Sequence, residues 1–159
     1  MSPDGRYLAA SAVWVQIYII GSDATLTAVL PQPFTVTLNA QGDRTAVSDM
    51  TWDQSSAFLL ISTASSSYDP RFVDGGVGVL SLSGNTLTET VYPTGSFGNG
   101  TGRILRVGSR VYAMGGCFLQ CVAHGNPSSV VGLDFQNGQL IPLTGSPYPY
   151  GNTGHMVIY

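Results

Sequence analysis

A pattern of three short strands recurs along this 159-residue chain at intervals of about 50 residues, and it limits the possible folds more than any other feature. Tyr7, Phe58 and Val111 occupy equivalent positions in the first strands of the three units and are 51 and 53 residues apart. Valine and tyrosine, which favour strands, and serine, threonine and glycine, which favour strands or tight turns, are common along the chain. We expect strands at 7–12, 15–20 and 25–30, at 57–63, 77–82 and 86–92, and at 110–114, 130–135 and 139–143.

Short turns join the last two strands of each unit. Gly84-Asn85 and Asn137-Gly138 fill this position in the second and third units, and Gly21-Ser22-Asp23 fills it in the first. An Asn-Gly pair between strands is the strongest short-range signal for a β-hairpin. The sequence therefore predicts antiparallel neighbours within each unit.

A further strand precedes two of the units, at 47–52 and at 103–107. The first unit begins at Met1 and has no such strand, whereas Gly154–Tyr159 resembles a leading strand that no unit follows. We expect four parts: a blade lacking its innermost strand, two further blades, and an innermost strand that completes another blade. They span residues 1–42, 43–97, 98–151 and 152–159. We also expect a homo-oligomer in which copies exchange these terminal strands head to tail.

The composition favours an all-β fold. Charged residues make up 9% of the chain, against roughly 25% in an average soluble domain. Lysine is absent and Glu89 is the one glutamate, so the residues that cover exposed helix faces are scarce. Antiparallel four-stranded units at this spacing predict a β-propeller segment of about three blades. A β-sandwich is the main alternative, although it needs no sequence repeat.

Several segments of the chain resemble a known family. The run from Ser2 to Ala9, with its Pro-Asp-Gly turn, and the run from Val131 to Tyr148 are similar to blades of bacterial lactonase-like and YVTN-type β-propellers. The corners at 54–56 and 108–110 depart from Pro-Asp-Gly. The resemblance implies a ring larger than this chain, which would bind or hydrolyse a small sugar-derived lactone at the mouth of the central channel. A non-catalytic interaction scaffold is the alternative, because propellers serve both functions.

The candidate ligand site combines polar residues that we expect at one face of the blades. Asp49, Arg103 and His155 stand at the start of the innermost strands, and the long loops 64–76 and 116–129 should open on the same face. Converging acidic, cationic and imidazole groups could bind an anionic sugar or polarise a carbonyl. Ordinary exposed loop residues are the alternative. The loops contribute Tyr68, Asp69, Arg71, Asp74 and His124.

Two cysteines, Cys117 and Cys121, lie close together in the second of these loops. With His124 they offer three ligands, fewer than the four that structural zinc sites use. Four residues of extended chain span about 13 Å, and a disulfide needs Cα atoms closer than roughly 7 Å, so the segment must curl to form one. A disulfide and two buried thiols both remain open, and we expect no metal and no cofactor.

The net charge of −3 leaves no basic stripe, which argues against nucleic acid as a partner. The apolar run from Val13 to Ile20 contains Gln16 and is too short to cross a bilayer. The expected partners are a small-molecule ligand or another protein. We expect export to the periplasm or the extracellular space as part of a longer chain, with a disulfide as support and the cytoplasm as the alternative.

Overall fold

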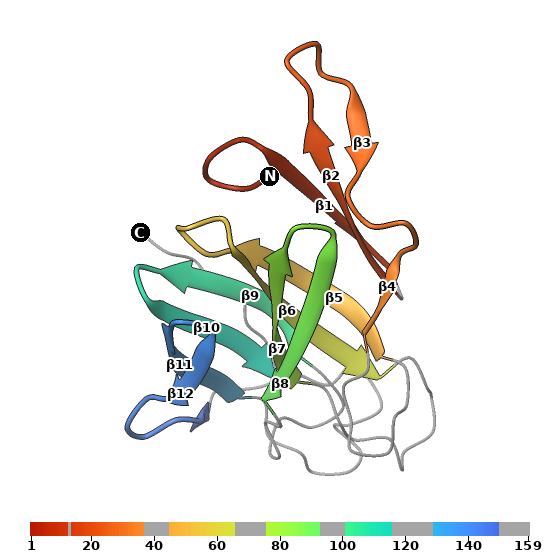
Figure 1. Cartoon of the computed structure of the whole chain (residues 1–159). Helices are drawn as coiled ribbons and strands as arrows, with labels where there is room; N and C mark the ends of the chain where they lie inside the picture. Colours follow the sequence, from red (N-terminus) through yellow and green to blue (C-terminus); the bar gives the residue numbers. More distant parts are fainter. Residues whose placement is uncertain (13, 37–44, 66–75, 93–100, 116–128, 150–159) are drawn as a thin grey trace.

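The computed structural model describes residues 1–12, 14–36, 45–65, 76–92, 101–115 and 129–149 (Figure 1). Every regular element in this part of the chain is a β-strand. The strands form three antiparallel sheets that follow one another along the chain. The prediction of an all-β chain with about three such sheets is confirmed.

The first sheet has the order β1 (Tyr7–Ser11), β2 (Trp14–Ile20), β3 (Leu26–Ala28), and β4 (Phe34–Thr35) pairs with the start of β2. β3 and β4 therefore share one side of β2, and the sheet is three strands wide. β2 is the single sheet neighbour of β1 in the described part of the chain. Within these described residues, the outer side of β1 is thus a sheet edge.

The second sheet has four strands in chain order. Its two central strands, β6 and β7, pair along six residues of each, and β5 shows a register shift between Val47 and Asp49. A shift of this kind is a β-bulge, which bends a strand locally. The strands are β5 (Thr45–Trp52), β6 (Phe58–Ser65), β7 (Gly76–Ser83) and β8 (Thr86–Tyr92).

The third sheet repeats this order and adds a short fifth strand that pairs with the beginning of β11. Its edge strand β9 corresponds to β5 in position. The strands are β9 (Thr101–Val107), β10 (Arg110–Gly115), β11 (Ser129–Gln136), β12 (Gln139–Pro142) and β13 (Tyr148–Pro149).

The outermost strand is interrupted at the same place in the first and third sheets. The Val29 amide donates to the Ile17 carbonyl at 2.8 Å, and the Leu143 amide donates to the Gly132 carbonyl at 2.9 Å. After this bond the chain leaves the sheet and returns at β4 or β13. The prediction of continuous strands at 25–30 and 139–143 is therefore wrong at their final residues.

Proline explains these interruptions. Pro31 and Pro33 follow the end of β3, and Pro142 and Pro147 stand at and after the end of β12. Proline has no backbone N–H, so it cannot continue the ladder of hydrogen bonds along a sheet. The strands β4 and β13 were not predicted, because two residues are too few to form a recognisable strand pattern.

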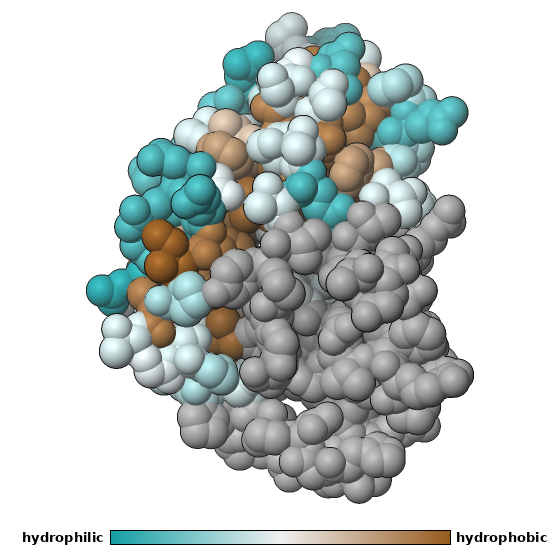
Figure 2. Space-filling view, turned by 60° about the horizontal axis from the view of Figure 1, so that its bottom comes forward, coloured by the Kyte–Doolittle hydropathy of each residue, from teal (hydrophilic) through white to brown (hydrophobic). Residues whose placement is uncertain are grey.

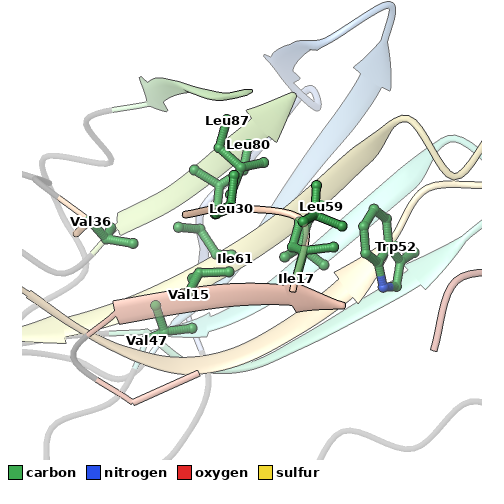
Figure 3. Close-up of a cluster of buried hydrophobic side chains, with 11 residues drawn as sticks. Val15, Ile17, Leu30, Val36, Val47, Trp52, Leu59, Ile61, Leu80 and Leu87 are labelled. Carbon is green, nitrogen blue, oxygen red and sulfur yellow. The ribbon is translucent and has the colours of Figure 1, made fainter. Parts of the chain in front are cut away.

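The three sheets pack face to face, with the second in the middle. Leu59 and Ile61 of β6 point into a core shared with the first sheet, where they meet Val15 and Ile17 of β2 (Figure 3). Leu60 points the other way, into a core shared with the third sheet. Because successive side chains of β6 point to opposite faces of the sheet, this strand contributes to both cores. Truncating a core leucine or isoleucine to alanine removes about 2–5 kcal/mol of stability.

The first and second sheets also stack in the same orientation, so that corresponding turns of the two sheets lie side by side. The Asp4 amide, in the turn before β1, donates to the Ser56 hydroxyl, in the turn before β6, at 3.2 Å. At the other end of these sheets, the Val47 amide donates to the Ala12 carbonyl at 3.0 Å. Sheets that stack with equal polarity in this way fit successive blades of a β-propeller.

Candidate functional site

The structure describes two residues of the predicted ligand site, Asp49 on β5 and Arg103 on β9. The start of β5 pairs with the end of β6, and the start of β9 pairs with the end of β10, so each long loop leaves its sheet beside the edge strand β5 or β9. The loops themselves lie largely outside the described residues. So do His155, Tyr68, Asp69, Arg71, Asp74, His124, Cys117 and Cys121.

Asp49 is half-buried and uses both carboxylate oxygens within the protein. Its Oδ1 accepts a hydrogen bond from the Met50 amide at 2.9 Å. Its Oδ2 accepts one from the Ile104 amide, in the neighbouring sheet, at 3.1 Å. A carboxylate that accepts backbone N–H groups makes charge-assisted hydrogen bonds, which are stronger than neutral ones.

Ser62 makes a second link beside the first. It is the register partner of Asp49 in β6, and its hydroxyl donates to the Gly102 carbonyl at 2.8 Å. Ser62 is fully buried. Ser62 was not among the predicted site residues, and its signal in the sequence is a serine that directly follows four apolar residues of β6.

The bonded groups on β9 belong to a sheet edge. β10 is the one sheet neighbour of β9 among the described residues, so alternate backbone groups of β9 point away from the sheet. Asp49 and Ser62 satisfy two of these groups, at Ile104 and Gly102. Arg103 lies between them and is exposed. The described part of the predicted site thus joins two sheets, and ligand binding by Asp49 and Arg103 remains a prediction.

A second polar cluster shapes the turn before β1. The Ser2 hydroxyl donates to Asp4 Oδ1 at 2.6 Å and accepts the Tyr7 amide at 2.9 Å. The backbone closes the same turn, because the Ser2 amide donates to the Tyr7 carbonyl at 2.8 Å. Gly5 completes it with a φ of 74°, a left-handed conformation that glycine adopts without strain.

The turn before β6 has the same bonds with the two side chains exchanged. Asp53 Oδ1 accepts the Phe58 amide at 2.9 Å, and Asp53 Oδ2 accepts the Ser55 hydroxyl at 2.6 Å. The Asp53 amide donates to the Phe58 carbonyl at 2.9 Å. Ser-x-Asp in the first turn therefore becomes Asp-x-Ser in the second. A comparison based on Pro-Asp-Gly cannot detect this equivalence.

Asp53 is buried, with 6% of its surface exposed, yet its pKa lies below the usual value. Burial is the largest influence and raises the pKa of this carboxyl. Hydrogen bonds from Ser55 and Phe58, together with the positive charge of Arg106 on β9, outweigh burial and lower the pKa. The folded state therefore favours the ionised form of Asp53, whose charge interacts with that of Arg106 in the third sheet.

The outer face of the first sheet is a third candidate, and it is apolar. Leu26, Leu87 and Leu140 lie at equivalent positions at or next to the start of β3, β8 and β12. Leu87 and Leu140 are 6% and 8% exposed, because the preceding sheet covers them. Leu26 has no preceding sheet among the described residues and is 51% exposed.

Other residues on this face of the first sheet are also more exposed than their equivalents in the second sheet. Leu8 pairs with Tyr18 in the first sheet, and both are half-buried. Leu59 and Leu80 make the equivalent pair in the second sheet, and both are buried. Figure 2 shows hydrophobic surface over the first sheet, at the top, and over the third sheet, on the left. The first sheet thus presents a core-like face to its surroundings.

Other kinds of site find no support in the described residues. They contain no group of three or more histidine, cysteine, aspartate or glutamate side chains placed to hold a metal ion. No helix long and apolar enough to cross a membrane occurs among them. Comparison with protein-family models, curated proteins and solved structures finds no match for this chain. The resemblance to lactonase-like propellers therefore remains a prediction.

Proposed function

We propose that this chain is a non-catalytic interaction scaffold of the β-propeller type, in which the apolar end faces of the stacked sheets bind another protein surface. The exposure of Leu26, 51% against 6% for Leu87, carries the proposal. Exposed contiguous apolar faces mark interaction sites in soluble proteins. The hydrogen bonds of Asp49 support the same reading, since they commit the one described carboxylate of the predicted ligand site to holding β9.

A lactone-opening assay separates the scaffold from a hydrolase. Water attacks the lactone carbonyl, the ring C–O bond breaks, and the carboxylic acid product releases a proton at neutral pH, which a pH-stat records. We expect no proton release above the buffer rate with γ- and δ-aldonolactones. Turnover that falls in Asp49→Ala or Arg103→Ala would replace the scaffold by a hydrolase.

A fluorescent apolar probe tests the proposed surface directly. At submicromolar protein, 8-anilinonaphthalene-1-sulfonate should bind the native chain, and Leu26→Asp should lower that signal. Ile19→Asp is the matched control, because Ile19 is 44% exposed in the neighbouring strand but lies on the opposite face, with Ile17. Equal signals for the native chain and Leu26→Asp would remove this face as a binding surface.

A further inference from the structure

The outer face of the third sheet corresponds to the face that would pack against the exposed face of the first sheet. Within the chain, Leu60 and Val79 of the second sheet cover the apolar face of the third. On the outer face of the third sheet, Tyr112 occupies the position that Leu60 has in the second sheet, and it is half-buried. Ile141 and Tyr148 extend this face and are 45% and 38% exposed. Both halves of one more sheet-to-sheet junction are therefore present, and no other sheet of the described residues covers either of them.

These two faces cannot meet within one chain. The second sheet lies between the first and the third, and it contacts them through opposite faces. Closing the stack on itself would need a ring of three sheets, which is below the usual range of about four to eight blades. A junction between the two faces therefore needs two molecules.

We propose that a second copy of this chain docks the outer face of its third sheet on the outer face of the first sheet, through Tyr112, Ile141 and Tyr148 on one side and Leu8, Tyr18 and Leu26 on the other. The inference rests on the proposed scaffold function and names the partner. It extends an interface that the chain already uses twice, between its first and second and between its second and third sheets. Two chains joined head to tail at both junctions form a ring of six sheets, within the range that propellers adopt.

The glycine at the centre of the third-sheet face supports its role as a contact surface. The space over Gly132 is filled by Tyr112, Leu143 and Tyr148, since an added Cβ would meet their side chains at 3.0 to 3.4 Å. The Tyr148 hydroxyl donates to the Thr144 carbonyl at 3.0 Å, which holds its ring on this face. The aromatic surface is thus preformed, and little side-chain entropy is lost on docking.

Light scattering after size exclusion measures the state of the full chain. We expect a mass of twice 16.7 kDa for the native protein at micromolar concentration and a monomer for Leu26→Asp and for Ile141→Asp. Ile19→Asp should remain a dimer. Circular dichroism confirms the fold of each variant, and Leu26→Ser and Ile141→Ser replace any aspartate variant that unfolds.

Mixing the two monomeric variants tests the head-to-tail geometry. Leu26→Asp keeps its third-sheet face and Ile141→Asp keeps its first-sheet face, so the mixture should form a heterodimer through one native junction. A native monomer at high concentration overturns the proposal. So does a dimer that survives Ile141→Asp, because the first sheets would then pair with each other, or a mixture that stays monomeric.

The two proposals fail in different ways. If the native chain is monomeric but binds the fluorescent probe through Leu26, the surface serves a different protein and only the self-association is wrong. If the probe does not detect the surface and the native chain is monomeric, both proposals are wrong. Turnover of a lactone removes the scaffold, whatever the oligomeric state.

Discussion

The Asp49 carboxylate accepts the Ile104 amide at 3.1 Å, across the junction between the second and third sheets. The two residues are 55 positions apart in the chain. The contact closes an edge of β9 that would otherwise expose unpaired backbone groups, which is the feature that makes sheet edges prone to unwanted pairing. A residue predicted to serve a ligand thus also serves the assembly of the sheets.

Removing this carboxylate should destabilise the protein. Asp49→Ala leaves the Ile104 N–H without its acceptor, and an unsatisfied buried donor costs about 1–3 kcal/mol. Asp49→Asn retains an acceptor oxygen and should lose less. Urea denaturation gives the free energies of unfolding, with Arg103→Ala, at an exposed neighbouring position, as the control within about 0.5 kcal/mol of the native protein. An unchanged Asp49→Ala variant would show that this hydrogen bond is not stabilising.

Acid should weaken the protein through Asp53. The folded protein holds the pKa of this carboxyl below the unfolded value of about 3.9, so the folded state favours the ionised form. The stabilisation is present above that pH and is lost as the pH falls through the lower, folded-state pKa. Denaturation curves from pH 7 to pH 3 should show a decline below about pH 4. Asp53→Asn should flatten the decline, and an identical slope in this variant would contradict the assignment.

Exchanging the side chains of one turn should preserve it. In the double variant Asp53→Ser with Ser55→Asp, the second turn takes the Ser-x-Asp order that Ser2 and Asp4 show in the first. Each single substitution breaks the hydroxyl–carboxylate pair, so we expect the double variant to be more stable than the sum of the singles predicts. A double-mutant cycle of unfolding free energies measures this coupling. Additive losses would mean that the two turns are not interchangeable.

Alanine substitutions at two glycines distinguish the cost of backbone strain from the cost of a steric clash. Gly108 and Gly138 have φ angles of 62° and 83°, so alanine at either should cost about 1–2 kcal/mol in the left-handed region. A Cβ at Gly138 would also meet the Phe58 ring at 2.9 Å, whereas Gly108 faces open space. Thermal unfolding should therefore rank Gly138→Ala below Gly108→Ala. The reverse order would show that the Phe58 ring yields without penalty.

Local features of the sequence were sufficient to predict the sheets. The repeat of about 50 residues gave the positions of β6 and β7 to within two residues. The hairpin turn at Asn137-Gly138 is confirmed by positive φ angles at both residues, 51° and 83°, as a type I′ turn requires. Prediction failed where proline interrupts the strand after Ala28, because the residues beyond the break stay apolar.

The sequence by itself determined that this chain forms three antiparallel sheets with apolar faces, since strand formation depends on residues a few positions apart. Only the tertiary structure decided what those faces and edges contact. The links from Asp49 to Ile104 and from Ser62 to Gly102, and the exposure of Leu26 beside the burial of Leu87, depend on which sheet lies against which. Such long-range packing leaves no periodic signal, because a buried and an exposed leucine are the same residue in the sequence.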